Sequence, residues 1–352
     1  MNVVRAEFAP FSLPLRRPLV TAQGSVSRRA GFLLRLHAEG GRVGVGEASP
    51  AFWLGGERLE ETERSLREIV RRARSRSAGA LASDASRAAA CALETALLDL
   101  DARASGVSAA ARLGGGTPQP IRQSALLVEP GLEGLAQEVE RALEEGVRSL
   151  KLKVGGSRSE DLRRVEQVRR QAGPAVAITL DANRAWGFDE ARAALEAFAP
   201  FAPAFVEEPL RSDDLGELAR LRAATGVPIA VDESLRDLED LDRVAAARAA
   251  DVVVLKLARL GGPRSLMTMA GRARAAGLRV ALTDSIDTAI GRSAVAHVAC
   301  ALSIAEVGLG GARLLAEDVD GGGPTGAAIV PSGPGLGVTL DPGFERSLDW
   351  HV

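Results

Sequence analysis

The chain contains 352 residues, of which 46% are hydrophobic, so it can bury a barrel-sized core together with a modest second domain. Its formal net charge is −2, which argues against a basic nucleic-acid-binding surface. No apolar stretch approaches the ~20 residues of a membrane-spanning helix, and residues 1–13 lack the pattern of a signal peptide. Cys91 and Cys300 have no CxxC spacing, which is typical of buried thiols. We therefore expect a cytoplasmic protein without a nucleic-acid or membrane partner.

The N-terminal third has the pattern of an α+β domain. Apolar and polar residues alternate in three segments with turns between them, which predicts an antiparallel meander at 3–13, 31–38 and 42–48. Two helical patterns follow at 59–73 and 84–105. A Gly/Pro-rich stretch at 114–118 marks a boundary. We predict a capping domain over 1–115, joined by the Gly-rich C-terminal tail 321–352.

From residue 121 onward, short apolar strands alternate with helical patterns. The predicted strands are 121–128, 149–153, 178–183, 205–209, 229–234, 252–257 and 279–283, with an eighth at 305–309. The predicted helices are 132–145, 160–170, 189–198, 214–224, 238–249, 263–276 and 288–302. This alternation indicates a parallel sheet covered by helices on its outer face. We predict a TIM-like (β/α) barrel over 116–320, so the whole chain belongs to the α/β class.

Charged residues recur at the ends of these strands. From Lys153 the steps to Asp181, Glu207, Asp232 and Lys256 are 28, 26, 25 and 24 residues, about the length of one strand, helix and two loops. The C-terminal ends of barrel strands meet at one face, where active sites lie. Three carboxylates there suit Mg²⁺. Helix N-capping is the alternative role for each one alone. Residues beside them are expected to orient the ligands: Asn183, Glu208 and Glu233.

Lysines flank the predicted carboxylates. Lys151 and Lys153 are two residues apart on one strand, so both point to the same face. Two close ammonium groups lower each other's pKa, and a lysine tuned in this way can accept a proton. Lys256 ends an apolar strand and is predicted to lie on the opposite side of a bound substrate. The alternative for the first pair is a solvated strand edge.

A loop-like apolar segment suggests a lid over the site. Phe52 and Trp53 precede Gly55 and Gly56, and Ser25 follows another glycine. Such a loop can close over a substrate. Ordinary packing between domains is the alternative. His297 lies in an apolar helix and is predicted to be a packed core residue.

The charged motifs resemble those of the enolase superfamily, in its muconate-lactonizing subgroup. The matching motifs are Lys151-Leu-Lys153, Asp181-Ala-Asn183, Glu207-Glu-Pro209, Asp232-Glu-Ser234, and Lys256 before Arg259-Leu-Gly-Gly262. The segments 46–50 and 93–99 resemble that family's capping domain. The resemblance implies a (β/α)7β barrel, Mg²⁺ held by the three carboxylates, and a small-molecule carboxylate substrate. It further implies that Lys153 removes the proton α to the carboxylate through an enediolate, with Lys256 facing it.

Within this subgroup the chain most resembles o-succinylbenzoate synthases, over 13–36 and 307–319. This implies a carbon–oxygen lyase that dehydrates a cyclohexadiene carboxylate in menaquinone biosynthesis. The segment 283–287 departs from the usual pattern, and Asp284 and Ser285 are its candidates for substrate contact. Asp318-Val-Asp320 and Gly291-Arg292 are similar to dipeptide epimerases and N-acylamino acid racemases, which form the alternative. We predict that the aspartate pair is instead a surface turn. A non-catalytic binding protein and a homo-oligomer also remain open.

Overall fold

The computed structural model describes residues 2–21, 24–54, 56–73, 85–116, 119–322, 328–329 and 332–352. The chain forms two compact units. The first comprises Met1–Arg122, Lys256–Thr268 and Leu282–Val352, and the second comprises Gln123–Leu255 and Met269–Ala281. Each unit is described separately.

A three-stranded antiparallel sheet forms the centre of the first unit, in the order β1-β2-β3. Its strands are β1 (Val3–Thr21), β2 (Gly24–Ala38) and β3 (Val43–Ala48). The predicted meander is confirmed, but β1 and β2 extend well beyond the predicted segments. They remain paired where the apolar alternation stops, with a register shift between Pro14 and Leu19. Cross-strand backbone pairing therefore continues through residues whose side chains are largely exposed.

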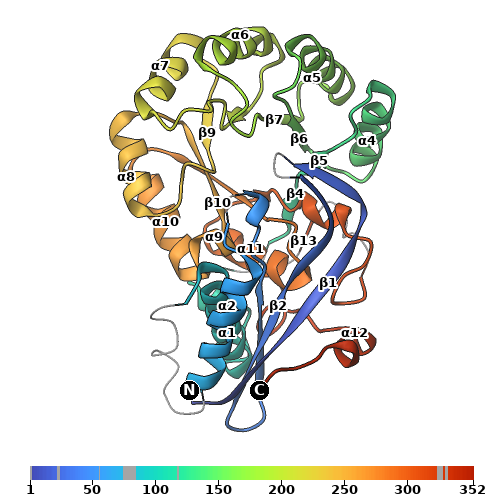
Figure 1. The fold of residues 1–352 in the computed structure, drawn as a ribbon, viewed down its shortest axis with the longest axis vertical. Helices are drawn as coiled ribbons and strands as arrows, with labels where there is room; N and C mark the ends of the chain where they lie inside the picture. Colours follow the sequence, from blue (N-terminus) through green and yellow to red (C-terminus); the bar gives the residue numbers. More distant parts are fainter. Residues whose placement is uncertain are drawn as a thin grey trace. The chain divides into compact units, whose positions relative to one another are not determined.

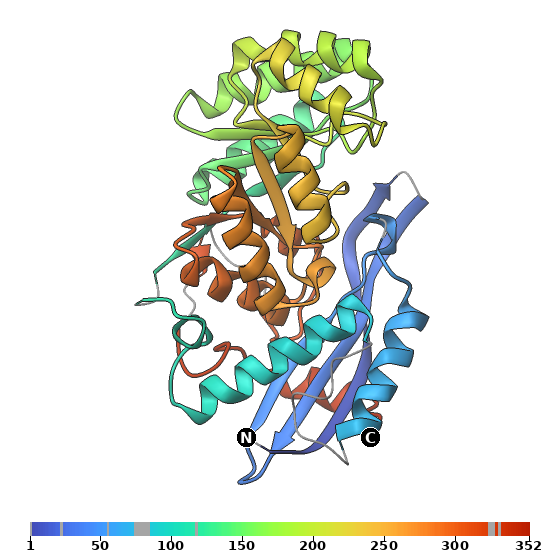
Figure 2. The same ribbon diagram turned by 90° about the vertical axis from the view of Figure 1, so that its left-hand side faces the viewer.

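Two helices cover one face of this sheet: α1 (Leu59–Ala73) and α2 (Arg87–Ala104) (Figure 2). Leu34, Leu66 and Leu93 are among the apolar side chains that bury this face. Helix α2 approaches β3 so closely that a Cβ on Gly46 would lie 2.0 Å from the carbonyl oxygen of Ala92. The helix α1 has the predicted bounds. Of the second predicted helix, 84–105, Asp84 lies outside the described residues, and α2 begins at Arg87, three residues later than predicted.

The remainder of the first unit contains a small sheet and short helices. The sheet has the order β12-β4-β13, from Glu306–Val307, Ile121–Gln123 and Ala328–Ile329. The helices are η1 (Phe52–Leu54), α3 (Ala109–Arg112), α9 (Leu257–Leu260), α11 (Ala289–Ala301), η4 (Gly310–Leu314) and α12 (Pro342–Ser347). The predicted eighth strand is therefore a two-residue strand beside β4. The tail returns to β1, where the backbones of His351 and Phe8 exchange two hydrogen bonds.

A curled sheet of seven strands dominates the second unit, in the order β11-β10-β9-β8-β7-β6-β5 (Figure 1). Its strands are β5 (Ala125–Leu127), β6 (Ser149–Lys153), β7 (Ala177–Asp181), β8 (Phe205–Glu207), β9 (Ile229–Val231), β10 (Val252–Lys256) and β11 (Arg279–Thr283). The pairings from β5 to β10 are parallel. The predicted strand 121–128 is divided, because β4 pairs in the small sheet and only β5 joins this one.

Helices follow the strands and lie along the outer side of the curled sheet (Figure 1). They are α4 (Leu132–Glu144), α5 (Arg158–Ala172), α6 (Phe188–Phe198), α7 (Leu215–Thr225), α8 (Leu238–Ala247) and α10 (Pro263–Ala275). Asp214 begins α7 by accepting hydrogen bonds from two of its backbone amides. The predicted helices are confirmed to within two residues. Among the described residues, no helix combines the length and apolar character needed to cross a bilayer.

Candidate metal centre and active site

The three predicted carboxylates lie at neighbouring strand ends of the curled sheet. Asp181 is the last residue of β7 and pairs in register with Glu207, the last residue of β8. Asp232 directly follows β9. All three are buried, with at most 3% of their surface exposed. Burying a carboxylate is costly without a cation or hydrogen-bond donors, so this edge of the sheet requires positive charge.

The carboxylates suit a divalent cation. Carboxylate oxygens of Glu207, Asp232 and Glu233 lie within 4.8 Å of one another. Asp181 is outside this group, and it is joined to Glu207 through the ammonium group of Lys151. The Lys151 Nζ lies 2.9 Å from Asp181 Oδ2 and 2.8 Å from Glu207 Oε2. Hard oxygen donors in this number fit Mg²⁺, and the bound ammonium shows that these carboxylates already attract a cation.

The electrostatics of Lys151 differ from the sequence prediction. Burial opposes the charge on Lys151, but Asp181, Glu207 and Asp232 more than compensate and raise its pKa. The predicted lowering of the pKa by the neighbouring lysine is therefore wrong for Lys151, because the charges of three carboxylates raise it instead. The carboxylates therefore favour the charged form of Lys151, which places a positive charge between Asp181 and Glu207.

Lys153 is the more exposed of the two lysines, with 38% of its side chain accessible. Its Nζ lies 3.8 Å from Asp181 Oδ2 and donates a hydrogen bond to Asn183 Oδ1. Asn183 in turn donates from Nδ2 to Glu233 Oε1 over 3.0 Å. The backbone of Asn183 is left-handed, with φ of 42°, a conformation that residues other than glycine seldom adopt. Lys153 is thus connected through Asn183 to Glu233, one of the three clustered carboxylates.

Glu208 supports the end of β9. Its carboxylate accepts hydrogen bonds from the backbone amides of Asp232 and Ser234 and from the Ser234 hydroxyl. Burial, together with the charge of Glu233, raises the pKa of Glu208 to about 7. The contact with Ser234 was not foreseen from the sequence. The only available signal was the motif Asp232-Glu-Ser234, in which a serine follows two acidic residues.

The other predicted residues belong to the first unit. Lys256 is the last residue of β10 and is 6% exposed. Asp284 and Ser285 follow β11, and Asp284 Oδ2 and Ser285 Oγ are buried polar atoms without a hydrogen-bond partner among the described residues. Burial raises the pKa of Asp284 above its ordinary value. Buried polar atoms without a partner are uncommon in folded proteins. A bound substrate could supply the missing partners, so both residues stay predicted substrate contacts.

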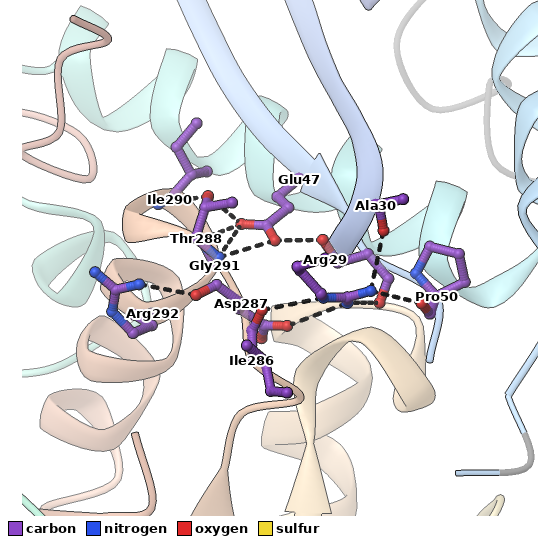
Figure 3. A network of polar contacts seen from close by, with 11 residues as sticks. Arg29, Ala30, Glu47, Pro50, Ile286, Asp287, Thr288, Ile290, Gly291 and Arg292 are labelled. Carbon is purple, nitrogen blue, oxygen red and sulfur yellow. Dashed lines mark hydrogen bonds and ion pairs between the residues drawn. The ribbon is translucent and has the colours of Figure 1, made fainter. Parts of the chain in front are cut away.

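A buried network holds the segment that follows them (Figure 3). Glu47 of β3 accepts hydrogen bonds from the Thr288 amide (3.1 Å), the Thr288 hydroxyl (2.6 Å) and the Gly291 amide (2.8 Å). A Cβ on Gly291 would lie 2.8 Å from Glu47 Oε2, so glycine makes this approach feasible. The carboxylate stabilises the first turn of α11, where backbone amides lack partners. Neither Glu47 nor its role was predicted from the sequence.

Arg29 joins three segments of the same network (Figure 3). Its guanidinium group is fully buried, and its Nε donates to the carbonyl oxygen of Ile286 over 3.0 Å. The other donors reach carbonyl oxygens of Ala30, Ser49 and Pro50. An ion pair of 3.8 Å connects Arg29 to Asp287. The turn after β11 is thereby fixed to the loop after β3, another contact that sequence reasoning missed.

The predicted lid residues differ in their environments. Trp53 is 8% exposed and packs against the Arg29 guanidinium, with 5.1 Å from Cζ to the ring centroid. Phe52 is 46% exposed and contacts Trp53 edge-on. Ser25 is exposed and pairs with Val20 in the hairpin of β1 and β2. Because Trp53 is anchored, any lid movement would centre on Phe52, and the lid remains a prediction.

Only one of the two aspartates that were predicted to form a surface turn is exposed. Asp318 is buried, and its Oδ2 accepts from Arg292 over 2.7 Å. Its Oδ1 accepts from the backbone amide of Ala289 over 2.9 Å. The prediction is therefore wrong for Asp318, because a buried arginine and a helix start require its charge. Asp320 is exposed and accepts from the Gly322 amide in a turn.

Comparison with known proteins places the chain in a family. Residues 134–344, more than half of the chain, match the family described as enolase C-terminal domain-like. The chain belongs to the enolase superfamily. This confirms the family predicted from the motifs. The superfamily binds Mg²⁺, so the chain is a magnesium-dependent enzyme, and the carboxylate group supplies suitable ligands.

Relatives of this enolase superfamily enzyme catalyse several reactions. The L-Ala-D/L-Glu epimerase of Bacillus subtilis (strain 168) is 30% identical over 96% of this chain and 97% of its own length. The o-succinylbenzoate synthase of Thermobifida fusca is 38% identical over 58% of this chain and 65% of its own length. The muconate lactonizing enzyme of Pseudomonas fluorescens, solved with muconolactone, has a TM-score of 0.90 at 27% identity, covering 98% of both chains.

Proposed function

We propose that this enzyme removes a proton α to a carboxylate, with Lys153 as the base and Asp181, Glu207 and Asp232 as magnesium ligands. The position of Lys153 carries the proposal. It lies beside Asp181 and is hydrogen-bonded through Asn183 to Glu233, at the edge where the carboxylates gather. We further propose that the seven-stranded sheet belongs to a (β/α)7β barrel, and that Lys256, at the end of β10, is the second lysine of the reaction.

The residues divide the work of proton removal. Asp181, Glu207 and Asp232 would hold the magnesium ion, which would supply positive charge for the carboxylate oxygens of the substrate. Lys151, held between Asp181 and Glu207, adds a fixed positive charge that needs no movement during the reaction. Lys153 is accessible and two residues away on the same strand, so it takes the proton.

The proposed reaction is dehydration of a cyclohexadiene carboxylate to o-succinylbenzoate. The C–H bond α to the carboxylate breaks and its proton passes to Lys153. Hydroxide then leaves the adjacent carbon, takes that proton back from Lys153 and departs as water, so a double bond forms without any oxidant and Lys153 is regenerated. The similarity to o-succinylbenzoate synthases supports this choice. So does Asp318, whose oxygens are engaged by Arg292 and Ala289, which leaves Asp320 alone to receive a substrate ammonium group.

Epimerisation of a dipeptide, or racemisation of an N-acylamino acid, is the second candidate. The observation that favours it is the similarity to the Bacillus subtilis epimerase over almost the whole chain. This reaction would require Lys153 and Lys256 to act on opposite faces of the α-carbon. It involves no leaving group, so its product would have the same composition as its substrate.

A substrate panel separates the two candidates. Purified enzyme with Mg²⁺ is assayed on the cyclohexadiene carboxylate, on N-succinylamino acids and on L-Ala-D-Glu-type dipeptides. We expect kcat/KM for dehydration to exceed that for the best racemisation or epimerisation by at least about 100-fold, or ~2.7 kcal/mol in transition-state stabilisation. If kcat/KM for epimerisation of a dipeptide exceeds kcat/KM for dehydration of the diene, epimerisation becomes the first candidate.

A further inference from the structure

Glu208 follows the metal ligand Glu207 in sequence but interacts with the next strand. Its Oε1 accepts from the backbone amide of Asp232 over 2.8 Å and from that of Ser234 over 2.7 Å. Its Oε2 accepts from the Ser234 hydroxyl over 2.9 Å. The side chain is 2% exposed. One buried carboxylate thus binds both ends of the three-residue turn that carries Asp232 and Glu233.

The backbone of Glu208 departs from the strand to make these contacts. In an extended strand, neighbouring side chains point to opposite faces, so Glu207 and Glu208 would diverge. Glu208 instead has φ of 42°, in the left-handed region that residues other than glycine seldom adopt. Two backbone bonds secure it, from its own amide to Ala230 and from the Arg184 amide to its carbonyl oxygen. Strain of this kind is characteristic of functional sites.

A carboxylate is an unfavourable choice for packing alone at this position. It adds negative charge beside Asp232 and Glu233, which lie in the carboxylate group that fits a cation. Like charges at short range repel one another. What the carboxylate provides in return is a double acceptor for the two amides, which fixes the directions in which the 232–234 turn presents its side chains.

We propose that Glu208 is a positioning residue for the magnesium site, which holds the 232–234 turn so that Asp232 meets Glu207 at the cation. The proposal rests on the assignment of Asp232 as a ligand, and it is independent of which reaction the enzyme catalyses. Residues that orient metal ligands typically change metal affinity 10- to 100-fold when they are removed.

The test is the affinity for Mg²⁺ alone, measured by isothermal titration calorimetry on the full chain without substrate. We expect Glu208→Ala to raise the Mg²⁺ Kd about 10- to 100-fold. Glu208→Gln should stay within about threefold, because its amide oxygen can still accept both backbone bonds and its amide nitrogen can donate to Ser234. Ser234→Ala, which removes one of the three bonds, should fall between them and provides the test if Glu208→Ala does not fold.

Asp251, which directly precedes β10, provides a matched control because it binds the backbone of the same strand, β9. Its Oδ2 accepts from the backbone amide of Ile229, at the opposite end of β9, over 3.0 Å. Asp251→Ala should lower the unfolding temperature without changing the Mg²⁺ Kd. Glu208→Ala binding Mg²⁺ within twofold of wild type, or Asp251→Ala losing as much affinity, would overturn the positioning role. Wild-type affinity in Asp232→Ala would overturn the ligand assignment and the proposal with it.

Discussion

Replacing Lys151 with methionine should destabilise the metal-free enzyme strongly. The Lys151 Nζ lies 2.9 Å from Asp181 Oδ2, and 2.9 and 2.8 Å from the two oxygens of Glu207. The lysine side chain is 18% exposed, and the carboxylates are nearly inaccessible. Removing one partner of a buried ion pair leaves an uncompensated charge and costs ~3–5 kcal/mol. Partial exposure of the lysine places the expected loss at the lower end, about 3 kcal/mol.

Magnesium should restore much of this loss. A cation on the same carboxylates replaces the missing ammonium charge, and a ligand that binds only the folded state adds stability that grows with its concentration over Kd. Stabilisation by saturating Mg²⁺ should therefore be larger in Lys151→Met than in wild type. The assay is urea-induced unfolding followed by circular dichroism, in excess chelator and in saturating Mg²⁺.

Lys153→Met is the matched control, because its ammonium is more exposed and lies 3.8 Å from Asp181. A pair of that kind contributes under ~1 kcal/mol. Equal losses for the two variants in chelator would refute the reasoning, since Lys151 would then carry no special charge compensation. A loss in Lys151→Met that is unchanged by Mg²⁺ would also refute it.

Burial lowers the pKa of His297 to about 4. As the pH falls, this histidine is therefore protonated in the unfolded chain at a higher pH than in the folded chain. The free energy of unfolding should fall between pH 6.5 and 4 by about 3 kcal/mol more in wild type than in His297→Gln, measured by urea unfolding across this range. Arg29→Met should lower the free energy of unfolding by roughly 3–5 kcal/mol in the same assay, because it leaves buried acceptors unpaired. The control Arg28→Met, at an exposed arginine, should cost far less, and similar losses for the two variants would contradict this. Asp320→Asn should change stability by less than ~0.5 kcal/mol and leave kinetics unaltered, and a large loss specific to ammonium substrates would favour epimerisation. Lys256→Ala should slow dehydration without abolishing α-proton removal, and loss of exchange for one enantiomer only would indicate a racemase.

The regular elements of this enzyme were predictable because they depend on local patterns. Continuous apolar runs such as 252–255 and the spacing of about 25 residues located the strands of the curled sheet. The charged ends of those runs identified Asp181, Glu207 and Asp232, since strand ends of a parallel sheet share one edge. The helices followed from their periodicity.

The remaining features depend on contacts between residues far apart in sequence. Arg29 reaches the carbonyl oxygen of Ile286, 257 residues away, and Glu47 reaches Thr288 across 241 residues. No local pattern distinguishes these residues from surface charges. The burial of Asp318 was missed for the same reason, because its partner Arg292 lies on another element. The pKa of Lys151 was misjudged because sequence spacing reveals its lysine neighbour but not the distances to the carboxylates.

The most direct test of the central claim, that Lys153 removes an α proton in a magnesium-dependent reaction, is exchange in deuterated water. The α-proton signal of the substrate turned over in the panel is followed by ¹H NMR with wild type and with Lys153→Ala. With wild type and Mg²⁺ the account predicts that the α-proton signal disappears as the diene is dehydrated, or is replaced by deuterium if a dipeptide or N-acylamino acid is turned over. In excess chelator neither change should occur. Lys153→Ala should be slower by about 10²- to 10⁴-fold. Proton exchange at the wild-type rate in Lys153→Ala, or in wild type stripped of Mg²⁺, would contradict it.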